Sequence, residues 1–178
     1  MSPRAAWRLE TLGFTQVYDY IGGKADWFAA GLPREGRLTS IPRAGDVARR
    51  DDVTCGPTDS IEDVINTMRQ AETETSIVTI GGGVVLGRVQ INRLDAGVQG
   101  PVEEVMELGP TTTRADATIE TVLERLNARN VANILVATSD GRLVGTLYRS
   151  DAEARLNEGW VEESAQPIDD ESCCCCKD

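Results

Sequence analysis

The chain has 178 residues, and its 29 acidic residues outnumber its 18 basic ones, which gives a formal net charge of −11. That excess disfavours binding to duplex nucleic acid or to anionic membranes, because both need clustered lysine and arginine. No segment approaches the roughly 18 apolar residues of a membrane-spanning helix, and the first residues do not read as a signal peptide, so we expect a cytoplasmic protein.

The N-terminal residues predict a small unit of helix, strand and helix. Apolar residues at positions 5, 6, 9 and 12, followed by Gly13, indicate a short helix. Residues 15–20 then read as a strand, and residues 25–33 as a second short helix closed by glycine and proline. A unit of about 35 residues is too short to bury its own core, so its aromatic side chains must pack on the repeats, pack on a partner or stay partly exposed, and we expect the first of these. They are Trp7, Phe14, Tyr18, Tyr20, Trp27 and Phe28.

The middle of the chain repeats itself at a constant spacing. Residues 60–64 (SIEDV) return as residues 118–122 (TIETV), and Gly87 returns as Gly145. The shift is the same in both places, since 118 − 60 and 145 − 87 both give 58. We therefore expect two structural units of one design, and such a repeat sets the fold.

Each repeat predicts the same order of elements. Apolar residues at helical spacing indicate an amphipathic helix, led in the first repeat by Ile61 and in the second by Ile119. Two short apolar runs follow, joined by turns at residues 81–83 and 139–141, which is typical of a β-hairpin. Residues 92–96 and 150–156 can each begin a further helix. The predicted order is strand, helix, strand, strand, helix.

At these residues the chain resembles a CBS domain pair, also called a Bateman module, over about residues 44–156. The resemblance is carried by GTLYRSD at residues 145–151, which ends the second hairpin, and by VEEVM at residues 102–106, similar to that family's lead-in. It implies an α/β fold in which tandem repeats pack as a pseudo-two-fold pair. It also implies a regulatory binding module without catalysis of its own.

The resemblance also implies where an adenosine-containing ligand binds, in clefts between the repeats. In that family an Asp or Asn holds the ribose hydroxyls, and Asp151 stands at this position. Tyr148 replaces the usual hydroxyl residue three positions earlier, and Arg149 is placed to meet a phosphate. The nucleotide-binding residues implied for the second repeat are Thr112, Thr113, Ile134, Tyr148, Arg149 and Asp151.

The first repeat departs from this pattern. Gln90 stands at the hydroxyl position and Arg93 at the ribose position, and a guanidinium offers donors but no acceptor. We include Gln90, Arg93 and Ser76 as an altered first-repeat cleft and expect the second repeat to bind. Plainer interpretations stay open: Asp151 as an acid that stabilises a helix start, Tyr148 as a packed aromatic and the arginines as solvated charges.

Residues 2–36 resemble the C-terminal part of a rhodanese homology domain. The matching features are paired alanines in a helix, a Gly-Phe turn, a strand, a Gly-Gly turn and a helix with Trp27. In that family the nucleophilic cysteine lies in a loop before this segment, and Cys55 lies well after it. The chain also has no histidine to pair with a cysteine. We therefore expect no enzyme.

The C-terminal residues predict a disordered acidic tail that ends in Cys173, Cys174, Cys175 and Cys176. Clustered thiols can bind zinc or copper or respond to oxidation. Four neighbouring cysteines cannot easily surround one tetrahedral ion, however, so we expect incidental thiols and no metal site.

Three functions remain open. We favour a non-catalytic regulatory protein, a homodimer by resemblance, that binds AMP, ADP, ATP or S-adenosylmethionine and passes the bound state to an unidentified protein partner. The alternatives are a ligand-free interaction scaffold and a metal- or redox-responsive protein. The expected organisation is a rhodanese-like fragment (1–36), a linker (37–43), a first CBS repeat (44–97), a second (98–156) and the tail (157–178).

Overall fold

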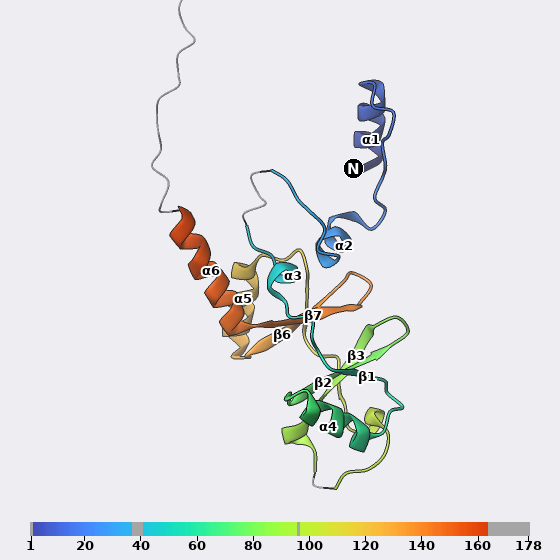
Figure 1. The fold of residues 1–178 in the computed structure, drawn as a ribbon, viewed down its shortest axis with the longest axis vertical. Coiled ribbons are helices and arrows are strands. Elements are labelled where there is room, and N and C mark those ends of the chain that lie inside the picture. Colours follow the sequence, from blue (N-terminus) through green and yellow to red (C-terminus); the bar gives the residue numbers. More distant parts are fainter. Residues whose placement is uncertain (1, 37–40, 96, 164–178) are drawn as a thin grey trace, which may run out of the picture.

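The computed structural model describes residues 2–36, 41–95 and 97–163. Each repeat forms its own small α/β unit, and the two units lie next to each other, with the N-terminal segment beyond the second (Figure 1). The fold is thus a pair of tandem repeats, as the sequence predicts.

The elements of the two repeats correspond one to one up to the end of the hairpin. The first repeat contains β1 (Thr54–Cys55), α4 (Ile61–Gln70), β2 (Thr75–Ile80) and β3 (Val84–Gln90). The second contains β5 (Thr112–Arg114), α5 (Ile119–Arg129), β6 (Asn133–Ala137) and β7 (Leu143–Tyr148). In each, the first strand runs parallel to the second, and the second and third form an antiparallel hairpin.

The helices bury the apolar stripe that the spacing predicts. Ile61, Val64 and Met68 of α4 are buried in one core cluster. The corresponding residues of α5 are buried in a second cluster, which belongs to the second repeat. Burial of these side chains holds each helix against its own sheet, because apolar surface removed from water stabilises the fold by about 25 cal/mol per Å².

The segments that lead into the repeats are exchanged between them. At the start of the first repeat, in its lead-in (residues 44–52), α3 (Ala44–Val47) packs on the second repeat, where the N–H of Gly45 donates to the carbonyl of Ala115 (3.0 Å). In the corresponding lead-in of the second repeat (residues 102–110), the turn η2 (Val102–Glu104) packs on the first repeat, where the N–H of Glu103 donates to the carbonyl of Pro57 (2.9 Å). The repeat shift relates the two donors, and it also relates the two acceptors, so the pair has pseudo-two-fold symmetry.

Each exchanged segment then adds backbone to the sheet of the other repeat. Glu107 and Leu108 form β4 (Glu107–Leu108), which pairs with β3, and Arg49 bridges to Thr146 of β7. Gly87 and Gly145, which the repeat shift relates, lie where each lead-in crosses the sheet of the other repeat. A Cβ on Gly87 would lie 2.8 Å from the Glu107 carbonyl oxygen, and a Cβ on Gly145 only 2.0 Å from that of Arg49. The close approach of two backbones explains why glycine occurs at both positions.

The hairpin tips meet in the same reciprocal way. The N–H of Val85 donates to the carbonyl of Gly141 (3.0 Å), and the N–H of Leu143 donates to that of Gly83 (2.9 Å). These bonds and the exchanged segments join two separate cores into one body.

The N-terminal segment differs from its prediction. The helices α1 (Ser2–Thr11) and α2 (Gly23–Ala29) form, but residues 15–20 form no strand, so that prediction was wrong. A strand needs a neighbour for its backbone groups, and none lies beside this stretch among the described residues. In Figure 1, α1 stands away from the repeats.

The aromatic residues of this segment behave in three ways. Tyr20 and Trp27 contact each other edge to face, with ring centres 5.2 Å apart. Trp7, Phe14 and Tyr18 are 65%, 59% and 87% exposed, so the expectation that they pack on the repeats was wrong. Phe28 does pack, since it contacts the core cluster of the second repeat. The N-terminal segment therefore contacts the second repeat near α2.

Two further predictions were wrong at the ends of the repeats. Residues 92–95 form no α-helix, and position 96 lies outside the described residues; the 3-10 turn η1 (Ile91–Arg93) forms instead, because the chain turns through Gly97 and Gly100, both at positive φ, to reach the next lead-in. At the second repeat, α6 (Arg149–Glu163) does form and continues past position 157, where the tail is predicted to begin.

The four C-terminal cysteines lie outside the described residues. Within the described ranges, no helix is both long enough and apolar enough to cross a bilayer.

Candidate functional site

Asp151 lies in the first turn of α6 and is paired with a residue from the lead-in of the other repeat. The Nε atom of Arg49 donates to Asp151 Oδ2 (2.6 Å), and Arg49 Nη2 donates to Oδ1 (2.9 Å). These hydrogen bonds lower the pKa of Asp151 and raise that of Arg49. The guanidinium also lies over the ring of Tyr148, 4.7 Å from its centre. Arg49, Tyr148 and Asp151 thus form one inter-repeat cluster.

A second carboxylate lies beside this cluster. The hydroxyl of Thr146 on β7 donates to Asp52 Oδ1 (2.6 Å), which again joins the second repeat to the lead-in of the first. Asp52 Oδ2 is buried and has no hydrogen-bond partner among the described residues. Burial raises the pKa of Asp52 above its ordinary 3.8, because the charged form loses hydration.

The raised pKa of Asp52 predicts a pH-dependent effect of Asp52→Asn. The folded state favours the protonated acid. The contribution of Asp52 to the free energy of unfolding is therefore fully present below the unfolded pKa and is lost as pH rises through the folded pKa. We expect Asp52→Asn, whose Oδ1 can still accept from Thr146, to be more stable than wild type near neutral pH. Urea unfolding across the acid range should show this advantage shrinking as pH falls.

The exposed Glu153 provides the control, because Glu153→Gln removes a carboxylate without relieving burial. A stability advantage of Asp52→Asn that stays the same at every pH would contradict the explanation.

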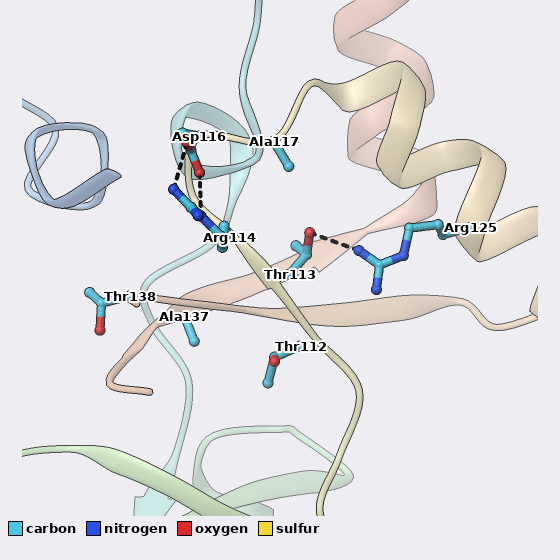
Figure 2. Close-up of a pocket in the computed structure, with 8 residues that line it drawn as sticks. All are labelled: Thr112, Thr113, Arg114, Asp116, Ala117, Arg125, Ala137 and Thr138. Atoms are coloured by element: carbon cyan, nitrogen blue, oxygen red, sulfur yellow. Dashed lines mark hydrogen bonds and ion pairs between the residues drawn. The ribbon is translucent and has the colours of Figure 1, made fainter. Parts of the chain in front are cut away.

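The predicted residues Thr112 and Thr113 lie elsewhere, in a pocket of about 370 Å³ on the second repeat. Figure 2 shows Arg125 reaching from α5 toward Thr113, whose hydroxyl lies 3.4 Å from Arg125 Nη1. Arg114 forms two hydrogen bonds with Asp116 (2.9 Å each). The pocket is lined by Thr112, Thr113, Arg114, Asp116, Ala117, Arg125, Ala137 and Thr138. Asp151 is not among these lining residues.

The two remaining second-repeat candidates have other contacts. Arg149 Nη2 donates to the carbonyls of Leu126 and Val131 at the C-terminal end of α5, where a cation is favourable. Ile134 is only 4% exposed and belongs to the core cluster of the second repeat.

Of the first-repeat candidates, Arg93 belongs to a different ion cluster, centred on Glu107. Glu107 Oε2 accepts from Arg88 Nε (2.9 Å) and from Arg93 Nη1 (3.2 Å), which lowers the pKa of Glu107. Gln90 is half-buried at the end of β3. Ser76 is fully buried, and its hydroxyl donates to the carbonyl of Val53 (3.2 Å) and lies 3.4 Å from Cys55 Sγ.

Cys55 offers no activated thiol. Its side chain is buried, and burial raises its pKa, which keeps the thiol protonated. In the described part of the chain, no group of three His, Cys, Asp or Glu residues could hold a metal ion.

The prediction from sequence missed the residues that complete these clusters, chiefly Arg49, Asp52 and Thr146 around Asp151. The repeat itself contained a signal for one of them. The shift that relates Arg93 to Asp151 also relates Arg49 to Glu107, and the charges are opposite in both cases. Extending the alignment of the repeats to the lead-ins would have paired these four positions.

A comparison with protein-family models matches the CBS domain twice, at residues 44–90 and 102–157, which together exceed half of the chain. The chain belongs to the CBS domain family. Proteins of this family are generally regulatory and non-catalytic. None of the curated proteins compared with the chain is a match.

Solved CBS structures share the fold at low identity. A structure described as CBSX2 in complex with AMP is 18% identical, with a TM-score of 0.59 over 66% of this chain and 97% of that one. The cytosolic domain of the Mg²⁺ channel MgtE in complex with ATP is 21% identical, with a TM-score of 0.58 over 64% of this chain and 48% of that one.

A third similar structure is the CBS domain pair of protein MJ0100 in complex with 5-methylthioadenosine and S-adenosyl-L-methionine. It is 20% identical, with a TM-score of 0.56 over 67% of this chain and 98% of that one. At these identities the likeness concerns the fold.

Proposed function

We propose that this CBS pair is a non-catalytic regulatory module that binds an adenine nucleotide or adenosyl ligand between its repeats. The observation that carries the proposal is the position of the Asp151 carboxylate, which belongs to the second repeat and contacts Arg49 of the first repeat's lead-in. A ligand held there would touch both repeats, so its binding would change how they pack on each other. Three similar CBS structures hold AMP, ATP, or 5-methylthioadenosine with S-adenosylmethionine.

The side chains at this position suit a nucleoside. The two oxygens of Asp151 can accept from the vicinal ribose hydroxyls. The half-buried ring of Tyr148 offers a face on which a base can stack. These contacts use the ligand's sugar and base.

The pocket around Thr113 is a second binding position. Its volume of about 370 Å³ lies within the range of small-molecule sites, about 300–1,000 Å³. The guanidinium groups of Arg114 and Arg125 favour an anionic group there, such as a phosphate.

Isothermal titration of the full chain with AMP, ADP, ATP, NAD and S-adenosylmethionine tests the proposal. We expect saturable binding of at least one of these, and a loss of about tenfold or more in affinity in Asp151→Ala, because a hydrogen bond to a charged group contributes about 1.5–3 kcal/mol. Glu153→Ala, which removes an exposed carboxylate from the same helix, should bind like wild type. Equal affinity in Asp151→Ala would contradict the assignment of Asp151.

A ligand-free interaction scaffold is the second candidate, and one observation favours it. Both motif residues, Arg93 and Asp151, are already ion-paired within the chain. If titration with all five ligands produces no binding heat, the ligand-free scaffold becomes the favoured function.

The same proposal includes four features that were first inferred from the sequence. The rhodanese-like residues 2–36 take no part in catalysis, because Cys55 is buried in the first repeat and no histidine is present. The protein acts in the cytoplasm. It forms a homodimer and regulates a partner protein.

A further inference from the structure

The two motif positions carry ion pairs that are related by the repeat and reversed in charge. In one, Arg49 of the lead-in pairs with Asp151 of the motif. In the other, Glu107 of the lead-in pairs with Arg93 of the motif. Both members follow the repeat shift, since 107 − 49 and 151 − 93 give the same value. Each pair therefore joins the lead-in of one repeat to the motif residue of the other.

In the Asp151 pair, the arginine uses both oxygens of the acid. Nε and Nη2 each donate to a different carboxylate oxygen, at 2.6 and 2.9 Å. These are the atoms that two vicinal hydroxyls would need. The same guanidinium covers the Tyr148 ring. A nucleoside would thus compete with Arg49 for the Asp151 oxygens and for this face of the Tyr148 ring.

Moving Arg49 requires no rearrangement of the core. Its side chain is 54% exposed, whereas that of Asp151 is 23% exposed. Ion pairs that are exposed to this degree are weak, and a long side chain can leave them for solvent. A guanidinium released in this way regains a strong partner only if the incoming ligand carries an anionic group, because arginine pairs well with phosphate.

We propose that Arg49 selects the ligand: it covers Asp151 in the free protein and is drawn away by the phosphate of a bound nucleotide, so that phosphorylated ligands bind better than uncharged nucleosides. The inference rests on the function proposed above and names its ligand class. An uncharged nucleoside must break the Arg49–Asp151 pair without replacing it. A nucleoside monophosphate breaks the pair and supplies a new anion to Arg49.

The opposite ion pair provides a matched control. Glu107→Gln weakens the pairs with Arg88 and Arg93 at the related position, and it leaves the contacts of Arg49 and Asp151 unchanged. The side chain of Glu107 is 43% exposed, so the substitution changes a partly exposed ion pair like the one between Arg49 and Asp151.

The experiment titrates AMP and adenosine into the full chain as wild type, Arg49→Gln, Arg49→Lys and Glu107→Gln. We expect wild type and Glu107→Gln to prefer AMP by about tenfold. In Arg49→Gln we expect adenosine to bind about three- to tenfold better than in wild type, and the preference for AMP to fall to about one, as loss of an exposed ion pair and its ring contact predicts. Arg49→Lys keeps the charge without the two-point contact, so it should retain part of the preference.

The outcomes separate the two proposals. If AMP and adenosine bind to wild type and their ratio is unchanged in Arg49→Gln, the role of Arg49 is wrong and the proposed function stands. A fall of the ratio in Glu107→Gln, with none in Arg49→Gln, would likewise overturn it. If neither ligand binds to any of the four proteins, the role of Arg49 is wrong, and the titration with all five ligands decides the proposed function separately.

Discussion

Gly145→Ala is expected to destabilise the protein by about 2–4 kcal/mol, because the new methyl group meets backbone that cannot move aside alone. The added Cβ would lie 2.0 Å from the carbonyl oxygen of Arg49. That oxygen accepts from the N–H of Thr146 (2.9 Å), and the N–H of Arg49 donates to the carbonyl of Thr146 (2.9 Å). The lead-in must therefore separate from β7, and both hydrogen bonds are strained or lost. Urea or thermal denaturation measures the effect.

Gly87→Ala is the related substitution in the first repeat, and it should cost less. There the Cβ would lie 2.8 Å from the carbonyl oxygen of Glu107, so a smaller shift relieves the clash. We expect wild type to be the most stable, Gly87→Ala to be less stable and Gly145→Ala to be the least stable. If Gly145→Ala were as stable as wild type, the lead-in of the first repeat would not lie against β7, and the contact between Arg49 and Asp151 would lose its support.

Leu126→Ala should cost about 2–5 kcal/mol, the usual range for a leucine removed from a closed core. Its side chain is fully buried in the cluster formed by α5, β6 and β7. The matched substitution is Leu12→Ala, just beyond α1, where the side chain is 59% exposed and the expected change is within about 0.5 kcal/mol. Denaturation of both variants compares them directly. A comparable loss in Leu12→Ala would mean that the N-terminal segment packs on the repeats after all.

The sequence predicted the fold well where the pattern depends on near neighbours. Helical spacing of Ile61, Val64 and Met68 located α4, and the Asp140-Gly141 turn located the second hairpin. The constant shift between the repeats then implied two equivalent units. Such patterns can be read along the chain because a helix or hairpin is built from residues only a few positions apart.

The prediction failed where a segment needed a partner from elsewhere. Residues 15–20 have the composition of a strand but no neighbouring strand among the described residues, and Trp7 has no apolar surface there to cover it. For the candidate site, the sequence identified Asp151 through a family resemblance and placed Thr112 and Thr113 beside it. In the structure these threonines line a pocket whose lining does not include Asp151.

By itself, the sequence determined the repeat, the order of elements within it and the position of Asp151 at the start of a helix. Only the tertiary structure decided that the lead-ins are exchanged between the repeats and that Asp151 meets Arg49, 102 residues away. The reason is physical: local propensity and periodicity select helices and strands, whereas the partner of a charged side chain depends on how two separately folded cores pack together. Here that packing depends on Gly145, whose missing side chain lets the Arg49 backbone approach β7.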